Sequence, residues 1–361
     1  MTVFNLTNTD LKNQHMFFGE KLNISRFDIQ KHPIFYKLVE QQLGFFWQPS
    51  EIDLSKDNKD FKILSDAQKH IFTSNLLYQT TLDSIQSRSL SLALLPHVSL
   101  PELESCIEAW GFFESLHSLA YAHILRNIYA DPTAEFDKII LTEEILERAK
   151  QPVKYYDDFI NASNEYKNSK ITLMELKEKI ILLIASINIL EGINFYASFA
   201  CSFAFPEQGL MQGNASILSL IARDEALHLG ITQNILKKWR DGNDDPEMVK
   251  IYKKCLPKIE KMFYQVIENE KVWAKYLFKD GSMMGLNEQI LGQYIEYIAG
   301  KRMKNLGIKH EFSTKNPLSW TDKYLKSSDN QVAPQEQEIL TYIIGGVKND
   351  TQDTSFDEFT F

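Results

Sequence analysis

Residues 108–123 read Glu-Ala-Trp-Gly-Phe-Phe-Glu-Ser-Leu-His-Ser-Leu-Ala-Tyr-Ala-His, and the other motifs of the chain can be interpreted from this stretch. Within it, Glu114 and His117 stand three positions apart, and Tyr121 follows four positions after the histidine. On an α-helix these steps bring a carboxylate, an imidazole and a phenol onto one face. The neighbouring residues are mostly apolar, so the pattern predicts a helix that points three polar groups into a protein interior.

A second stretch repeats this pattern. The run Ile221-Ala-Arg-Asp-Glu-Ala-Leu-His228 places Glu225 three positions before His228, and two more acids, Asp83 and Glu191, lie in other apolar segments. A buried carboxylate is costly unless it binds a cation. Two Glu-x-x-His helices with one carboxylate from each of two further helices form the ligand set of dinuclear carboxylate bundles. We therefore predict a dinuclear metal site with six ligands: Asp83, Glu114, His117, Glu191, Glu225 and His228.

The types of donor atom limit which metals the site would bind. Four carboxylates and two imidazoles suit iron or manganese better than zinc, and four negative charges balance two divalent ions. Spacing alone also allows Asp224, which lies four positions before His228, to be the ligand. The equivalence of the two Glu-x-x-His pairs favours Glu225, and Asp224 then becomes an acceptor that orients a ligating histidine.

Most of the chain between residues 34 and 303 is predicted to be helical. The expected helices cover residues 34–47, 65–90, 101–129, 172–206, 214–242, 245–278 and 286–303, with two shorter helices between 141 and 168. Ser65-x-x-Gln68 and Thr172-x-x-Glu175 are capping boxes, and Asn214 is expected to cap its helix. Several helices exceed 20 residues and no segment alternates like a strand. These features predict an all-α, ferritin-like bundle of long helices around the metal site.

Three regions are expected along the chain. Residues 1–30 show little periodicity and are predicted to form an N-terminal arm, and residues 31–339 form the helical domain. Residues 340–361 lose the periodicity and are predicted to be a disordered tail. The apolar run 180–205 is long enough for a membrane, but it contains polar and charged residues, so we interpret it as a helix buried in protein rather than a membrane span.

The overall composition argues against a nucleic-acid-binding, a disulfide-rich or a secreted protein. The 361 residues include 39 Lys and Arg against 48 Asp and Glu, and the net charge of -9 disfavours a nucleic-acid surface. The three cysteines have no paired spacing, which argues against a disulfide framework and favours a reducing cytoplasm. The first 20 residues lack the pattern of a signal peptide.

Tyr121 lies about one helical turn beyond the metal ligands. The residues expected to surround its hydroxyl from two other ligand-bearing helices are all apolar: Phe195, Phe199, Leu218 and Ile221. Spacing leaves two alternatives open. The tyrosine is either an ordinary core residue, or a phenol that an oxygen-activating metal pair oxidises and that the apolar wall protects.

Several motifs strongly resemble the small subunit of class I ribonucleotide reductase, most closely the bacterial class Ia type. They are the ligand set, Tyr121, and the runs His70-Ile-Phe-Thr-Ser-Asn-Leu-Leu-Tyr-Gln-Thr80, Phe199-Ala-Cys-Ser-Phe-Ala-Phe205 and Ile221 to His228. The resemblance spans nearly the whole chain. It implies that a di-iron-oxo centre, or a manganese or mixed pair, reacts with oxygen to oxidise Tyr121. The radical equivalent then passes to a separate large subunit, which reduces ribonucleotides to deoxyribonucleotides.

The resemblance also implies further roles and partners. The implied transfer route consists of His117, Asp224, Trp47 and Tyr342, and Ser355-Phe-Asp-Glu-Phe-Thr-Phe361 resembles the tail peptide that docks on the large subunit. A homodimer and an external electron donor are implied as well. The alternatives are another ferritin-like di-iron oxidase and an iron-binding protein without enzymatic activity.

The sequence departs from the family pattern in three places. Residues 118–120 lack the Ser-Arg-Ser often found after the histidine, Asn194 stands where a basic residue is common, and Gly192 replaces a bulkier neighbour. None of these departures affects a predicted ligand.

Overall fold

A computed structural model describes residues 4–7 and 10–325 of the chain. The predicted tail at 340–361, with Tyr342, lies outside the described residues. The long helices are α1 (Pro33–Gly44), α3 (Asp66–Ala93), α4 (Pro101–Ile128), α6 (Glu143–Lys167), α7 (Leu173–Ile189), α9 (Gln212–Asp241), α10 (Pro246–Leu277) and α11 (Glu288–Asn305). The shorter helices are α2 (Ser55–Ile63), α5 (Pro132–Asp137), α8 (Phe195–Phe203) and α12 (Asp322–Leu325). The π-helix η4 (Leu190–Asn194) joins α7 to α8, and single 3₁₀ turns are η1 (Pro49–Glu51), η2 (Leu95–His97), η3 (Ile139–Leu141), η5 (Pro206–Gln208) and η6 (Ser319–Thr321).

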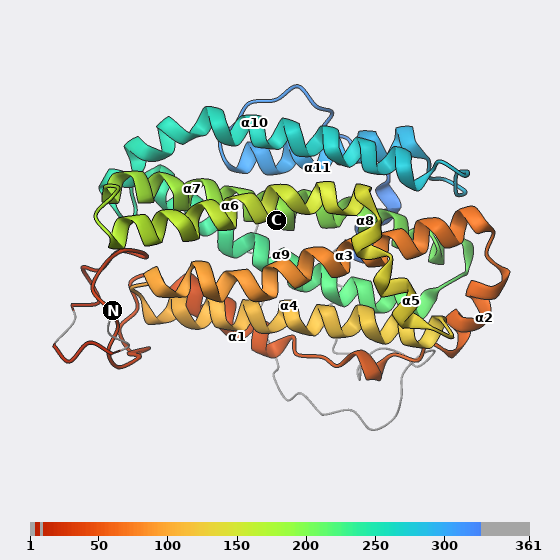
Figure 1. Ribbon diagram of the computed structural model, residues 1–361, viewed down its shortest axis with the longest axis horizontal. Helices are drawn as coiled ribbons and strands as arrows, with labels where there is room; N and C mark the ends of the chain where they lie inside the picture. The colour runs from red at the N-terminus through yellow and green to blue at the C-terminus, as the bar shows by residue number, and fades with distance from the viewer. Residues whose placement is uncertain (1–3, 8–9, 326–361) are drawn as a thin grey trace.

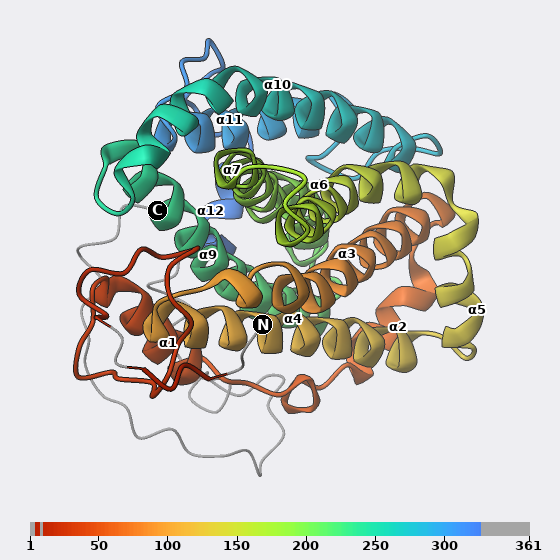
Figure 2. The same ribbon diagram turned by 60° about the vertical axis from the view of Figure 1, so that its left-hand side comes forward.

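The long helices lie side by side along the longest axis of the molecule (Figure 1). α10 and α11 form one outer layer, and α3 and α4 form the opposite side with α1 outside α4. Figure 2 shows α6 and α7 nearly end-on between these layers. α3 packs against α4, α7 and η4 pack against α9, and α4 also packs against α9. The four elements that carry the predicted ligands therefore converge in the middle of the bundle.

Local sequence signals explain where the central helices begin. Ser65 and Gln68 form a capping box at the start of α3, and Thr172 and Glu175 form one at the start of α7. Two isolated bridges pair single residues of the described part of the chain, Phe17 with Val98 and Met283 with Leu286. The predicted all-α, ferritin-like bundle is confirmed.

The core runs along α7, η4 and α8. Every residue from Ile180 to Phe205 is buried. The stretch Leu173–Gln208 is long and apolar enough to cross a membrane, but its most apolar window is entirely enclosed by the rest of the protein. It is therefore the core helix of a soluble protein, as the acid and amide within it predict.

The region 141–168 differs from its prediction. It forms one helix, α6, and Pro152 lies inside it. A proline in a helix interior removes one hydrogen bond and costs roughly 3 kcal/mol. The inner face of α6 buries Tyr156 and Phe159, and α6 packs against α3 and α7. This apolar burial offsets the cost of the proline, so two separate helices were the wrong prediction.

The start of α9 also differs from its prediction. Met211, with a φ of 54°, occupies the N-cap position expected for Asn214. Asp57 of α2 accepts hydrogen bonds from the backbone N–H groups of Gly213, at 3.0 Å, and Asn214, at 2.6 Å. A carboxylate from another helix thus satisfies donors that a local cap would otherwise satisfy, and the predicted cap is wrong.

Candidate metal centre

The six predicted ligands meet in the core of the bundle. They come from α3 (Asp83), α4 (Glu114 and His117), η4 (Glu191) and α9 (Glu225 and His228). All six side chains are completely buried. Residues that are far apart in the sequence, from α3 to α9, therefore form one cluster. They come together because α4 and η4 both pack against α9.

The cluster consists of two overlapping groups of donors. Asp83 and His117 form one group with Glu114 and Glu225, and the donor atoms of this group all lie within 4.8 Å of one another. A second group of the same compactness consists of Glu191, His228 and the same two glutamates. Two groups that share two carboxylates could hold two cations side by side, with Glu114 and Glu225 within reach of both. We refer below to the Asp83/His117 position and the Glu191/His228 position.

Both histidines present Nδ1 to the carboxylates. His117 Nδ1 lies 3.0 Å from Glu225 Oε1 and 3.8 Å from Asp83 Oδ2. His228 Nδ1 lies 3.0 Å from Glu114 Oε1 and 3.1 Å from Glu225 Oε2. The shared glutamates are thus in direct reach of both imidazoles, so one carboxylate can serve two cations.

Several buried carboxylate oxygens of the cluster lack hydrogen-bond partners, which indicates whether these residues suit a metal ion. Both carboxylate oxygens of Asp83, and Oε2 of Glu114 and of Glu191, are buried without a hydrogen-bond partner in the described part of the chain. Leaving such an acceptor unsatisfied costs about 1–3 kcal/mol, and more for a charged group. Cations would satisfy all of these oxygens at once, so the donor set fits two metal ions.

The charges of the cluster shift its protonation equilibria. Burial raises the pKa of Asp83 well above its usual range, and the charges of Glu114 and Glu225 reinforce the shift. Burial likewise raises the pKa of Glu191 well above its usual range. Burial lowers the pKa of His228, but the two glutamate charges outweigh it and bring the value to about 9. Without metal, the cluster therefore holds protons that cations would displace.

A chain of polar contacts links the cluster to Trp47. The indole Nε1–H of Trp47 donates a hydrogen bond of 2.8 Å to Asp224 Oδ2, and the same oxygen lies 3.3 Å from His117 Nε2. Arg223 donates to the other oxygen of Asp224 at 3.2 Å and to the carbonyl of Phe45 at 2.6 Å. Asp224 therefore contacts the far nitrogen of a histidine in the cluster and lies outside both donor groups.

Tyr121 lies beside this cluster and is completely buried. Burial raises the pKa of its phenol well above the usual range, and the charge of Asp83 is the next largest cause. All four predicted wall residues are fully buried as well: Phe195, Phe199, Leu218 and Ile221. The rings of Phe195 and Phe199 stack with centroids 6.0 Å apart. That these four line the Tyr121 hydroxyl stays a prediction.

Three neighbours of the cluster were missed in the sequence. Trp110 Nε1–H donates to Glu114 Oε1 at 2.6 Å, Gln86 donates to Glu191 Oε1, and the Tyr156 hydroxyl donates to Gln86 Oε1 at 2.7 Å. The spacing of Trp110 four positions before a ligand is a signal that could have found it. Tyr156 lies on α6, which carries no ligand, and only the fold brings it near.

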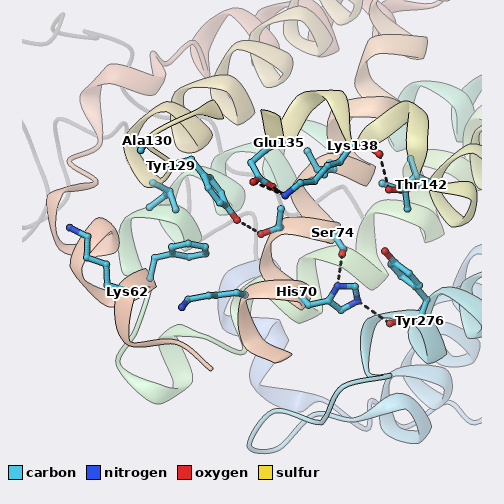
Figure 3. A pocket seen from close by; sticks show the side chains of 15 residues that line it. Lys62, His70, Ser74, Tyr129, Ala130, Glu135, Lys138, Thr142 and Tyr276 are labelled. Carbon is cyan, nitrogen blue, oxygen red and sulfur yellow. Dashed lines mark hydrogen bonds and ion pairs between the residues drawn. The ribbon is translucent and has the colours of Figure 1, made fainter. Parts of the chain in front are cut away.

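A separate surface pocket of about 580 Å³ lies along the N-terminal half of α3. Figure 3 shows His70 there, between the Ser74 hydroxyl and the backbone carbonyl of Tyr276, with Lys138 paired to Glu135. None of the predicted site residues lines this pocket. The predicted site residues that the structure describes therefore lie in the buried core of the bundle and not in this pocket.

The chain is similar along most of its length to one family of known proteins. A family model described as ribonucleotide reductase, small chain, matches residues 24–317. The ribonucleoside-diphosphate reductase subunit beta of Haemophilus influenzae is 48% identical over 372 residues, which cover 99% of each chain. The ribonucleoside-diphosphate reductase 1 subunit beta of Escherichia coli O157:H7 is 48% identical over 98% of each chain. The ribonucleotide reductase R2 subunit from Clostridium botulinum is 26% identical, with a TM-score of 0.79 over 90% of this chain and 98% of that one. Because the match extends over the whole bundle that holds the six clustered donors, this chain belongs to the ribonucleotide reductase small-chain family.

Proposed function

We propose that the chain is the small, radical-generating subunit of a ribonucleoside-diphosphate reductase, an oxidoreductase that acts with a large subunit. The observation that carries this proposal is the pair of donor groups that share Glu114 and Glu225 next to a buried tyrosine. The full-length similarity to proteins named reductase beta subunits supports the same function.

The proposed ligands divide into terminal and bridging roles. Asp83 with His117, and Glu191 with His228, would each hold one ion, and Glu114 and Glu225 would hold both. When bound, two iron ions would react with oxygen and so provide the oxidant for a one-electron oxidation of a nearby side chain. A manganese pair or a mixed pair fits the same oxygen-rich donors.

Tyr121 is the proposed site of the radical. Its oxidation removes one electron and one proton from the phenol, and Asp83 is the charge that acts on this hydroxyl most strongly. We assign Asp83 as the group that takes up the proton. The enclosed position of the ring keeps water and reductants away, which would preserve the radical.

The proposed route out of the core uses the contacts between His117, Asp224 and Trp47. Their polar atoms lie within 3.3 Å of one another along the chain of contacts, which suits coupled movement of an electron and a proton. An external donor would deliver the electrons for assembly through Trp47. Tyr342 would continue the route toward the large subunit, and residues 340–361 would dock there.

The proposal includes an assembly and a location. We divide the chain into an arm at 1–30, a helical domain at 31–339 and a docking tail, and we place the protein in the cytoplasm. Exposed apolar residues of α1, of the segment just after it and of α4 support a homodimer contact on this face: Leu43, Phe46, Phe112 and Leu119. Phe46 and Phe112 are 46% and 53% exposed and stack with centroids 6.2 Å apart. A second copy of the chain would remove this apolar surface from water.

Reconstitution tests the proposed activity. Iron-loaded protein is mixed with the large subunit from the same organism, a ribonucleoside diphosphate and a dithiol reductant. Deoxyribonucleoside diphosphate should form only when both proteins are present. A fully iron-loaded chain that supports no product with an otherwise active large subunit would rule the proposal out.

A further inference from the structure

The ligand Glu191 lies in an irregular part of the core helix. It belongs to the π-helix η4, whose wider turn interrupts the α-helical hydrogen bonding between α7 and α8. Such π-turns are rare, occur mostly as single turns inside α-helices, and are frequent at functional sites. Because the turn is unfavourable in isolation, contacts from outside the helix must hold it in place. Two independent sets of contacts do so, one at Asn194 and the other at Gly192.

The first set of contacts holds Asn194 at the end of η4. The side-chain amide of Asn194 donates to the Tyr78 hydroxyl at 2.9 Å and to Glu270 Oε1 at 2.8 Å. The Tyr78 hydroxyl in turn donates to Glu270 Oε1 at 2.8 Å. An amide nitrogen carries two hydrogens, so all three bonds form together. α3, η4 and α10 are thereby joined through one buried triangle.

The second set of contacts holds Gly192 on another side of η4. Arg302 of α11 donates from Nε to the carbonyl of Gly192 at 3.3 Å, and its guanidinium lies 4.9 Å from the ring centroid of Tyr196. A Cβ atom on Gly192 would lie 3.1 Å from Arg302 Cγ and from Leu229 Cδ1. The glycine therefore gives the arginine room to reach the backbone of the π-turn.

Glu270, which accepts the hydrogen bonds of Asn194 and Tyr78, is not one of the six proposed metal ligands. Glu270 is completely buried, and its Oε2 has no hydrogen-bond partner in the described residues. Burial raises the pKa of Glu270 to about 7, against the opposing charge of Arg148. A carboxylate is expensive at such a place, so its three-way contact with Tyr78 and Asn194 is a costly feature that calls for a function.

We propose that Glu270 and Arg302 are positioning residues that hold the π-turn, and through it the Glu191 carboxylate, at the Glu191/His228 metal position. This inference deepens the proposed function and rests on it. The Asp83/His117 position takes its own ligands from α3 and α4, outside the π-turn. Loss of either contact should therefore weaken one metal position and spare the other. A residue that merely stabilises the fold would affect both positions alike.

Stepwise Mn²⁺ binding to the full chain tests this selectivity, with free Mn²⁺ counted by electron paramagnetic resonance. The wild-type chain should bind two ions. In Glu270→Leu, one ion should keep its affinity and the other should bind roughly 10- to 100-fold more weakly, as is typical when a partner of a ligand is lost. Glu270→Gln, which keeps an acceptor oxygen, should restore most of the lost affinity. Glu268→Leu, an exposed glutamate two positions earlier on α10, is the matched control and should match the wild type.

Arg302→Met tests the same idea through the second set of contacts, should Glu270→Leu fail to fold. It keeps the apolar stem, removes the donor to Gly192, and should produce the same selective loss. Two ions bound with wild-type affinity in either folded variant would overturn the inference, and so would equal weakening of both ions. A wild-type chain that binds no pair of ions would contradict the proposed function itself. Because the measurement needs no radical, the two failures are distinguishable.

Discussion

Trp47 and Asp224 are 177 positions apart in the chain and share a hydrogen bond of 2.8 Å in the core. The acceptor oxygen also lies 3.3 Å from Nε2 of His117. Both bonding partners are buried, so water cannot replace either contact. Because this hydrogen bond can be removed without removing a proposed metal ligand, the proposed role of Trp47 is testable.

Trp47→Phe should leave metal binding intact and abolish turnover. The substitution keeps an aromatic ring and deletes the N–H that contacts Asp224. We expect nucleotide reduction with the large subunit to fall at least about 100-fold, as when a reacting geometry is lost. Metal content and steady-state turnover measure the two effects. Trp239→Phe, the same change at a buried tryptophan that packs on Phe17, should keep its turnover. Retention of more than half the activity in Trp47→Phe would remove Trp47 from the route.

The proposed docking tail separates radical formation from turnover. A chain that ends before Tyr342 should bind metal and form its radical as the full chain does, and it should reduce no nucleotide. Tyr342→Phe keeps the peptide and should still bind the large subunit, as a pull-down would detect, without turnover. Nucleotide reduction by the truncated chain would contradict both roles of this segment.

Metal uptake should release protons and depend on pH. In the metal-free cluster His228 has a pKa of about 9, so it carries a proton at neutral pH, whereas a ligating imidazole must be neutral. Affinity should therefore rise as pH increases toward 9, by up to about tenfold per pH unit for each proton displaced. Calorimetry of Mn²⁺ binding in buffers of different ionisation enthalpy counts these protons. A constant affinity between pH 6.5 and 8.5 would show that the metal-free cluster carries no such proton.

Phe112→Glu should separate the proposed dimer. A charge at this exposed aromatic residue disfavours burial against a second copy and leaves the core of α4 unchanged. Sedimentation velocity should show a monomer with wild-type helix content. Ile140→Glu, at a residue that is 72% exposed on η3, is the control and should remain dimeric. If Phe112→Glu sediments like the wild type, the contact lies on another face.

The sequence was most informative where signals are local. Ser65 with Gln68, and the two Glu-x-x-His pairs, follow helical spacing, so they predicted helix starts and a shared ligand face before any contact was known. Repetition of the four-residue motif Glu-x-x-His in two apolar helices is also rare enough to indicate a common centre. Asp83 and Glu191 were predicted as ligands because an acid in an apolar helix is costly to bury unless it binds a cation.

Features that depend on distant partners could not be predicted. The π-turn at Glu191 is held by Glu270, 76 positions from Asn194, and nothing in the local sequence of η4 indicates it. The start of α9 depends on Asp57, and the continuity of α6 through Pro152 depends on burial of its inner face. In each case a tertiary contact overrides the local preference.

Electron paramagnetic resonance after aerobic addition of iron(II) tests the central claim, which is that this bundle oxidises Tyr121. The wild-type chain should give a tyrosyl radical signal, and Tyr121→Phe should bind the same amount of iron and give none. Tyr156→Phe, at another buried tyrosine near the cluster, should keep the wild-type signal. A fully iron-loaded wild-type chain without a radical, or an unchanged tyrosyl signal in Tyr121→Phe, would contradict the account.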